Sequence, residues 1–405
     1  MQKLKNSFHN IECLDEVDRA VASAIAFHLV LMNCKNCIVS TSTFFLDFNT
    51  FLNIFCWALI FGNYLRIVVL KNVLAKVPSF VVVILAFLFV FCMVSQIGNT
   101  DLLTSNIFPY NYVRETYVTF LSYCLPCFVF TSVLNNPHSL LLSFYRYAWV
   151  LFIVSIGSFF LYIGGHSSSY EYSMSYANAL LFSIFIFLFL FYESKKYFYI
   201  VFALLLTACL LICGSRGPLI GILSLLFVYF ISIKGSLKVY FVQIMSFFSV
   251  LLLIVQQSEI INFFVNLLDK FNIQSRTLRM ISTGIMTDDS HRSDYFKAVF
   301  DALNDSPLFG LGAFGGSVQV GLTHNLYLDI WANFGYFIGS AIILFMFYSL
   351  IKIFRTAPNY SLVILFFSVN IFPRGFVGFD FWASKELWVL FGLIVSFYSR
   401  LQRPS

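Results

Sequence analysis

Long apolar stretches separated by short polar breaks run along nearly the whole chain. A helix that crosses a membrane needs roughly 20 consecutive, mostly apolar residues. The pattern predicts about twelve such helices, at 20–40, 48–65, 79–97, 116–134, 147–163, 175–192, 197–213, 218–233, 239–256, 326–350, 360–373 and 387–399. The first is the weakest, because His28 and Lys35 interrupt its apolar run. The pattern therefore predicts an all-α polytopic membrane protein.

One long segment, 257–325, does not look like a membrane span. It is expected to be a large loop within a single membrane domain that covers 1–405. An apolar helix over 260–271 is expected at the membrane interface. A second helix, over 292–304, places Tyr295, Phe296, Val299, Phe300 and Leu303 on one face at helical spacing. A glycine-rich run follows, with Gly310, Gly312, Gly315, Gly316 and Gly321.

The distribution of Lys and Arg predicts the orientation. The chain has 405 residues, of which 60% are hydrophobic and 11% charged. With the N-terminus inside, 15 basic residues fall on that side and only four in the short outer loops. Cytoplasmic loops are enriched in basic residues, so both termini are expected in the cytoplasm and 257–325 outside. This bias accounts for the net charge of +6, so no nucleic-acid partner is expected.

The cysteines do not predict a metal or redox site. Cys34 with Cys37 and Cys124 with Cys127 have CxxC spacing, but no second Cys or His pair accompanies either. We interpret them as small hydrophobic residues inside buried helices. No metal site is expected anywhere in the chain.

The first of three polar sites is the short turn 213–221, CGSRGPLIG. Gly217 can cap the next helix and Pro218 fits its first position. The free N–H groups of that helix then lie beside the Arg216 guanidinium, an arrangement suited to phosphate or diphosphate. The alternative is that Arg216 only reaches for the membrane interface.

The second site is Arg292, in the first turn of the loop helix, where a cation opposes the helix dipole. Arg276 and Arg279 could extend it into a basic funnel. The alternative for these three residues is a solvated face.

The third site is the start of the tenth span. His324 and Asn325 precede a helix whose first turns include Asp329 and Asn333. The positive end of a helix dipole lowers the pKa of a histidine, leaving a neutral imidazole that can accept a proton. The alternative is an ordinary interfacial histidine.

A charged outer loop precedes the last span, with Arg374, Asp380, Lys385 and Glu386. We expect it to be a solvated loop. Closure of a cleft is the alternative.

The three sites are expected on the same membrane face. A diphosphate clamp and a neutral base on one face suit glycosyl transfer from a lipid-linked donor. The SRG turn, the Arg292 helix ending in SPLFGLGAFGG, and the HN-led helix with Gly335 and Gly339 resemble the O-antigen polymerase and O-antigen ligase family of bacterial envelopes. The resemblance covers about 200–345.

The resemblance implies a metal-independent, inverting glycosyltransferase that needs no cofactor and uses undecaprenyl-diphosphate sugars. It implies that Arg216 and Arg292 bind the diphosphate and that His324 is the base or positions the acceptor. Substrate-binding residues are expected at Ser215, Gly217, Arg276, Arg279 and Asn325. The expected partners are an undecaprenyl-diphosphate-linked oligosaccharide, membrane lipid and, as a candidate, a chain-length regulator. The protein is then expected in the bacterial inner membrane, with a periplasmic loop 257–325.

Three functions fit the predicted spans and polar sites to different degrees. The first is an O-antigen polymerase, and the second is the ligase that transfers glycan to lipid A-core. The third is a non-enzymatic flippase for lipid-linked sugars. A carrier should place charged residues near the middle of the membrane, whereas the predicted spans here are nearly free of charge. This lack of charge within the spans favours an enzyme over a carrier.

Overall fold

The computed structural model describes 15–39, 49–98, 116–163, 174–213, 218, 221–222, 224, 266, 292–315, 325–376, 378 and 380–402. The predicted span 239–256 lies outside these residues. The same holds for most of 218–233 and of the loop 257–325, including its predicted interfacial helix.

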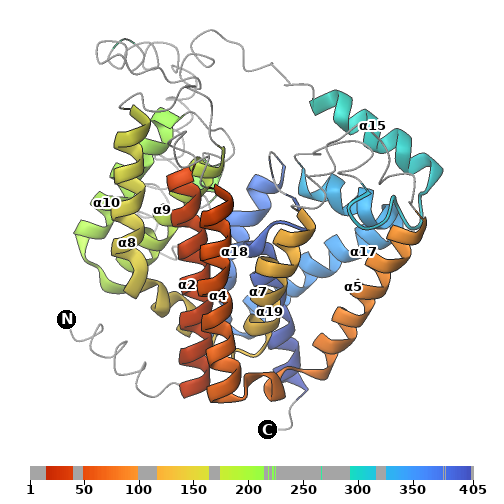
Figure 1. The fold of residues 1–405 in the computed structure, drawn as a ribbon, viewed down its shortest axis with the longest axis horizontal. Coiled ribbons are helices and arrows are strands. Elements are labelled where there is room, and N and C mark those ends of the chain that lie inside the picture. The colour runs from red at the N-terminus through yellow and green to blue at the C-terminus, as the bar shows by residue number, and fades with distance from the viewer. Residues whose placement is uncertain are drawn as a thin grey trace, which may run out of the picture. The chain divides into compact units, whose positions relative to one another are not determined.

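The regular structure of the described residues is helical (Figure 1). Ten predicted spans coincide with helices: α2 (Glu16–Val39), α4 (Asn49–Lys71), α5 (Ser79–Gly98), η3 (Phe120–Cys124) with α7 (Leu125–Ser132), α8 (His138–Ile163), α9 (Met174–Ser194), α10 (Tyr197–Cys213), α17 (Leu326–Thr356), α18 (Pro358–Gly375) and α19 (Lys385–Leu401). Within the described residues, α2, α4, α8, α9 and α17 are long and apolar enough to cross a membrane. The helical membrane class is thus confirmed, while the count of twelve stays a prediction.

The chain divides into two compact units. The first comprises Met1–Leu31, Ile54–Tyr147 and Ser290–Ser405, and the second comprises Met32–Asn53 and Ala148–Asp289. The single domain over 1–405 stays a prediction.

In the first unit, α7 packs against α19. Gly392 permits this approach, because a Cβ there would lie 2.7 Å from the carbonyl oxygen of Phe128. The π-helical turn η3 leads into α7. Pro126 has no N–H and cannot donate the α-helical bond to Ser122, which accounts for the wider turn before it.

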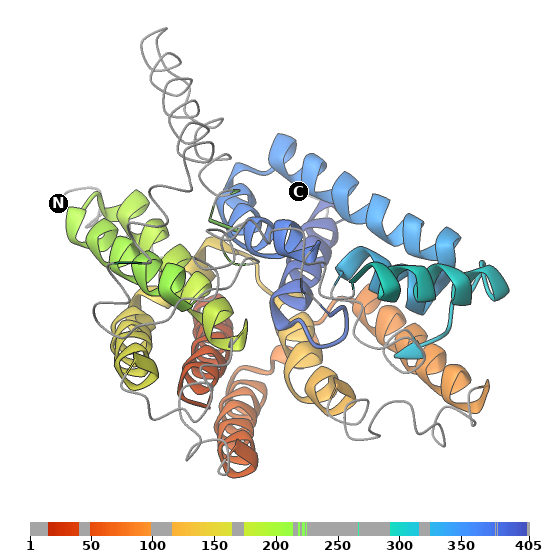
Figure 2. The same cartoon turned by 90° about the horizontal axis from the view of Figure 1, so that it is seen from above.

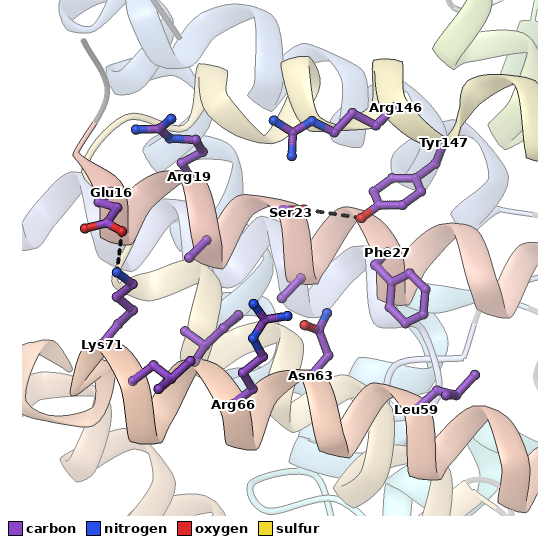
Figure 3. A pocket seen from close by; sticks show the side chains of 14 residues that line it. Glu16, Arg19, Ser23, Phe27, Leu59, Asn63, Arg66, Lys71, Arg146 and Tyr147 are labelled. Carbon is purple, nitrogen blue, oxygen red and sulfur yellow. Dashed lines mark hydrogen bonds and ion pairs between the residues drawn. The ribbon is translucent and has the colours of Figure 1, made fainter. Parts of the chain in front are cut away.

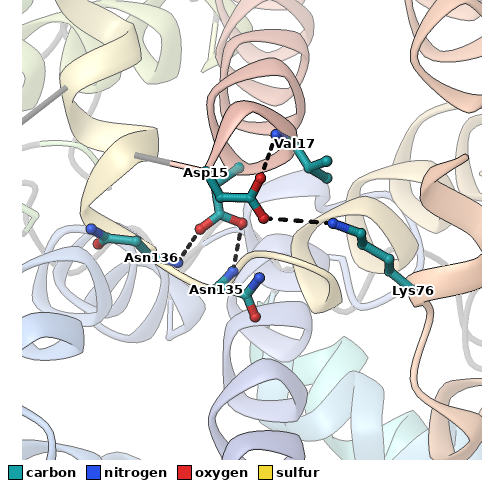
Figure 4. Close-up of polar contacts among 6 residues, drawn as sticks. Asp15, Val17, Lys76, Asn135 and Asn136 are labelled. Atoms are coloured by element: carbon teal, nitrogen blue, oxygen red, sulfur yellow. Dashed lines mark hydrogen bonds and ion pairs between the residues drawn. The ribbon is translucent and has the colours of Figure 1, made fainter. Parts of the chain in front are cut away.

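Two acidic residues anchor the start of α2 in the first unit (Figure 4). Asp15 accepts a bond from the backbone N–H of Val17 at 3.1 Å and pairs with Lys76 at 3.5 Å. Asp18 accepts bonds from the backbone N–H groups of Asn135 and Asn136 at 2.8 and 2.6 Å. These contacts tie the helix start to the turn after α7.

The two residues that weaken the first predicted span both have polar partners. His28 Nδ1 lies 3.1 Å from the Tyr64 hydroxyl and 3.3 Å from the Cys127 thiol, inside the first unit. Lys35 donates to the side chain of Asn53 at 2.7 Å, inside the second. Buried polar groups are tolerated where they have such partners, so α2 continues through both positions.

The second unit is built around α9 and α10, which pack side by side (Figure 1). Ring contacts join Phe152, Phe187 and Phe202. Ser155 adds polar contacts, because it lies 3.3 Å from Ser183 and its carbonyl accepts from the Tyr176 hydroxyl at 2.8 Å. The cysteines of both CxxC pairs are buried, as expected of small hydrophobic residues inside helices.

Candidate functional site

The predicted loop helix is present as α15 (Arg292–Asp305). It packs on α17 (Figure 2). Val299 and Leu303 are fully buried and form a core with Leu311 and Ala332, which confirms the predicted apolar face at these positions. Phe300 lies on that face but remains 39% exposed.

The glycine-rich segment after α15 docks backbone to backbone on α17. Leu311 N–H donates to the carbonyl of Ala332 at 2.7 Å, and Tyr336 N–H donates to that of Pro307 at 2.8 Å. The second bond is possible because α17 is kinked at Gly335, where φ is 78° and ψ 171°. The kink frees backbone groups that the segment then satisfies.

Two glycines are required where these backbones meet. A Cβ on Gly310 would lie 2.4 Å from the Gly335 nitrogen, and a Cβ on Gly335 would lie 2.5 Å from the carbonyl carbon of Leu308. Both residues also have positive φ, a region that glycine adopts at no steric cost. Two glycines that the sequence placed in separate motifs therefore form one contact.

The same segment is held by three further residues of the first unit. Ala313 N–H donates to the Ser95 hydroxyl of α5 at 2.9 Å. The Phe314 ring lies 4.7 Å from that of Trp382 and 5.7 Å from that of Tyr117. Neither Ser95 nor Trp382 stood out in the sequence, because a serine inside an apolar run and a single tryptophan in a charged loop carry no distinct signal.

The start of α17 is fixed by buried polar side chains. The amide oxygen of Asn325 caps the helix, accepting from Tyr327 and Leu328 N–H at 3.0 and 3.2 Å. Asp329 accepts from Phe381 N–H at 2.8 Å, and the Asn333 amide donates to the Asp329 carboxylate at 3.1 Å.

Trp382 completes this network by donating from its indole N–H to Asn333 at 2.9 Å. The network joins α17 to the loop before α19. Its sequence signal was an acidic residue inside an apolar span, which commonly marks a functional region.

The expectation of a solvated loop between α18 and α19 is wrong. Arg374 and Glu386 are buried. Arg374 donates to Asn370 at 2.6 Å, and Lys385 pairs with Glu386 at 3.2 Å. Asp380 accepts bonds from two backbone N–H groups of the loop, at 2.7 and 3.0 Å. Arg374 and Glu386 lie inside α18 and α19 rather than between them, and the packing of these helices buries their side chains.

Two opposing effects act on Glu386, which precedes the predicted span 387–399. Burial acts to raise the pKa of the Glu386 carboxyl, but the charges of Lys385 and Arg374 outweigh it and hold that pKa below its usual value.

Most predicted site residues lie outside the described part of the chain. These are Ser215, Arg216, Gly217, Arg276, Arg279 and His324. Arg292 is described as the first residue of α15, without its side chain. Pro218 is helical and buried, as its predicted position at a helix start requires. Asn325 caps α17, and a substrate contact by it stays a prediction.

Comparison with known proteins identifies the segment that carries these elements. Residues 200–346 match the family model described as O-antigen ligase. Over these residues, the match supports the resemblance to the O-antigen polymerase and ligase family that the sequence motifs indicated. None of the curated proteins matches the chain.

Members of this family are glycosyltransferase-like enzymes that act on lipid-linked glycans. The matched segment contains all eight predicted site residues together with α15, the glycine-rich segment and the first turns of α17. Ser95 and the 380–384 turn lie outside it and brace it.

The last feature of the site is its metal-binding capacity. Among the described residues, no three His, Cys, Asp or Glu side chains gather as metal ligands would. Metal independence stays a prediction, because much of the loop 257–325 lies outside the described residues.

Proposed function

We propose that this protein is an O-antigen polymerase. It joins undecaprenyl-diphosphate-linked repeat units at the periplasmic face of the bacterial inner membrane. The observation that carries the proposal is the family match over 200–346, which includes each of the three polar sites predicted from the sequence.

The reaction is an inverting glycosyl transfer. A hydroxyl group of the acceptor repeat unit attacks the anomeric carbon of the donor sugar, and its proton passes to His324. The bond between the anomeric carbon and the diphosphate oxygen breaks, and the electron pair leaves with the diphosphate. Arg216 and Arg292 bind that leaving group through charge-assisted hydrogen bonds. Ser215, Gly217, Arg276, Arg279 and Asn325 complete the substrate contacts.

The rigid frame around the start of α17 supports this assignment. The Asn325 cap and the Asp329 bond to Phe381 fix the backbone directly after His324. A positioned base is more effective than a mobile one, because the reactive geometry does not have to be found anew in each turnover.

The ligase is the second candidate, favoured by the printed description of the matching family. We prefer the polymerase, because a ligase must approach lipid A-core, whose negative charge would favour a more basic outer surface. The loop 257–325 carries five basic residues, and four acidic residues precede Arg292 within it, namely Glu259, Asp269, Asp288 and Asp289.

A deletion strain tests the function and separates the candidates. Loss of a polymerase is expected to leave lipid A-core carrying a single repeat unit. Loss of a ligase would leave bare core with polymer still on the lipid carrier. Loss of a flippase would leave bare core without lipid-linked polymer. A lipopolysaccharide gel combined with analysis of the carrier lipid distinguishes these outcomes, and an unchanged long glycan pattern would overturn all three.

A further inference from the structure

A basic cavity lies between α2, α4 and the first part of α8, within the first unit (Figure 3). Its volume is about 670 Å³. Four basic side chains line it, Arg19, Arg66, Lys71 and Arg146, against one carboxylate, Glu16. The lining therefore has three positive charges in excess.

The nearby acids are already engaged. Glu16 pairs with Lys71, Asp15 pairs with Lys76, and Asp18 accepts the two backbone bonds of the turn after α7. Among the described residues, no carboxylate lies within ion-pair distance of Arg19, Arg66 or Arg146. The buried Nε of Arg19 also has no hydrogen-bond partner there. This buried donor without an acceptor, beside two further guanidinium groups that have no carboxylate partner, favours an anionic ligand.

The cavity lining changes from charged to apolar along the helix axes. On α2, Arg19, Ser23 and Phe27 follow each other at four-residue spacing and share one face. On α4, which runs antiparallel, the order toward the same end is Arg66, Asn63 and Leu59. These six residues thus form a charged layer, a polar layer and an apolar layer.

Contacts at both ends fix this alignment. Glu16 meets Lys71 at the charged end, and the Ser23 hydroxyl lies 3.2 Å from that of Tyr147 in the polar layer. Phe27 lies eleven residues beyond Glu16, which corresponds to roughly 16 Å along the helix. Figure 3 shows Arg66 and Asn63 pointing from α4 toward α2, and Arg146 reaching along α8 in the direction of Arg19.

We propose that this cavity binds an anionic phospholipid. The phosphate meets Arg19, Arg66 and Arg146, and the start of the hydrocarbon chain lies against Phe27 and Leu59. Arginine suits phosphate because its planar fork donates paired hydrogen bonds. Basic pockets between transmembrane helices on the cytoplasmic side are typical sites for acidic lipid head groups.

The layered lining favours a lipid over a small anion. Free phosphate would satisfy the guanidinium groups but would leave the apolar layer in contact with water. The three arginines also lie on the side that the charge bias predicts to be cytoplasmic. The proposal depends on none of the residues assigned to glycosyl transfer.

Lipid binding to the purified full-length protein in detergent tests this site. Phosphatidylglycerol retained by the protein is measured by native mass spectrometry, with phosphatidylethanolamine and inorganic phosphate as the other two ligands. We expect retention of one tightly bound phosphatidylglycerol. Arg66→Gln and Arg146→Gln should each weaken it at least about tenfold, because a charge-assisted contact is lost.

Arg355→Gln is the matched control, since it removes an exposed positive charge from the same predicted side, outside the cavity. It should leave retention unchanged. Arg66 and Arg146 are themselves exposed, so both variants should fold, and their melting without lipid checks this. Unchanged retention in both cavity variants, equal loss in the control, or displacement of the lipid by inorganic phosphate at equal concentration would each overturn the proposal.

Discussion

Two side chains at the start of α17 accept hydrogen bonds from backbone N–H groups. The amide oxygen of Asn325 accepts two N–H groups that a helix start leaves without partners. The carboxylate of Asp329 holds the backbone of Phe381. Asn325 and Asp329 thus hold the backbone around the candidate site. The roles of Arg216, Arg292 and His324 rest on the sequence.

Substitution of Arg216 distinguishes two roles for its side chain, a diphosphate clamp and a membrane anchor. A lysine can replace an anchor, because it also carries its charge on a long stem to the interface. It cannot reproduce the paired hydrogen bonds of a guanidinium. Each such bond is worth about 1.5–3 kcal/mol, so losing one slows turnover on the order of 10- to 100-fold. We therefore expect Arg216→Lys and Arg216→Ala to accumulate normally and to fail to restore long glycan in the deletion strain.

The gel pattern of those variants also reports the reaction. A polymerase should leave core with one repeat unit, and a ligase should leave bare core. Full complementation by Arg216→Lys at matched protein level would make Arg216 an anchor, and would remove the main physical support for diphosphate chemistry at this turn.

At the scale of elements, α15, the glycine-rich segment and α17 act as one assembly. The core around Val299 and Leu303 joins the two helices, and the bonds of Leu311 and Tyr336 join the segment to the kink. Such backbone contacts tolerate no side chain at the meeting point. Displacing the segment would therefore disturb both helices of the candidate site.

Gly335→Ala tests this assembly. The new Cβ would meet the backbone of Leu308 at 2.5 Å in a region of positive φ. Backbone strain and overpacking together should cost on the order of 2–5 kcal/mol. We expect a lower melting temperature in detergent and loss of long glycan in cells. Gly157→Ala is the control, because nothing lies within 4 Å of its Cβ position and alanine favours a helix. A wild-type melting temperature for Gly335→Ala would contradict the described contact.

At the scale of the whole molecule, the distribution of basic residues among the loops predicts how the protein is oriented in the membrane. The fifteen basic residues of one set of loops, against four in the short loops of the other, are what the positive-inside rule requires of a fixed topology. With this predicted orientation, we expect the candidate site in the periplasm and the basic cavity on the cytoplasmic side.

Reporter fusions measure that orientation directly. Fusions after Gln257 and Gln274 should report the periplasm, and fusions after Lys196 and Lys238 the cytoplasm. Expression of each fusion at comparable level is the control. A cytoplasmic signal after Gln274 would refute the topology, and with it the shared face of the three polar sites.

The sequence by itself determined the helices and their class. In lipid each backbone polar group must be satisfied within its own segment, so a run of about 20 apolar residues specifies a helix without help from the rest of the chain. Local periodicity likewise identified α15 and its buried face at Val299 and Leu303. The family resemblance also came from local motifs, and the match over 200–346 confirms it.

Tertiary structure alone decided which distant groups meet. The contact of Gly310 with Gly335, the bond of Asp329 to Phe381 and the burial of Arg374 and Glu386 each depend on helices that pack across long stretches of sequence. Helix packing in membranes rests on shape and on individual polar contacts rather than on overall hydrophobicity. Hydropathy and charge counts therefore could not reveal these contacts, and they gave no sign of the cavity where α2, α4 and α8 gather their arginines.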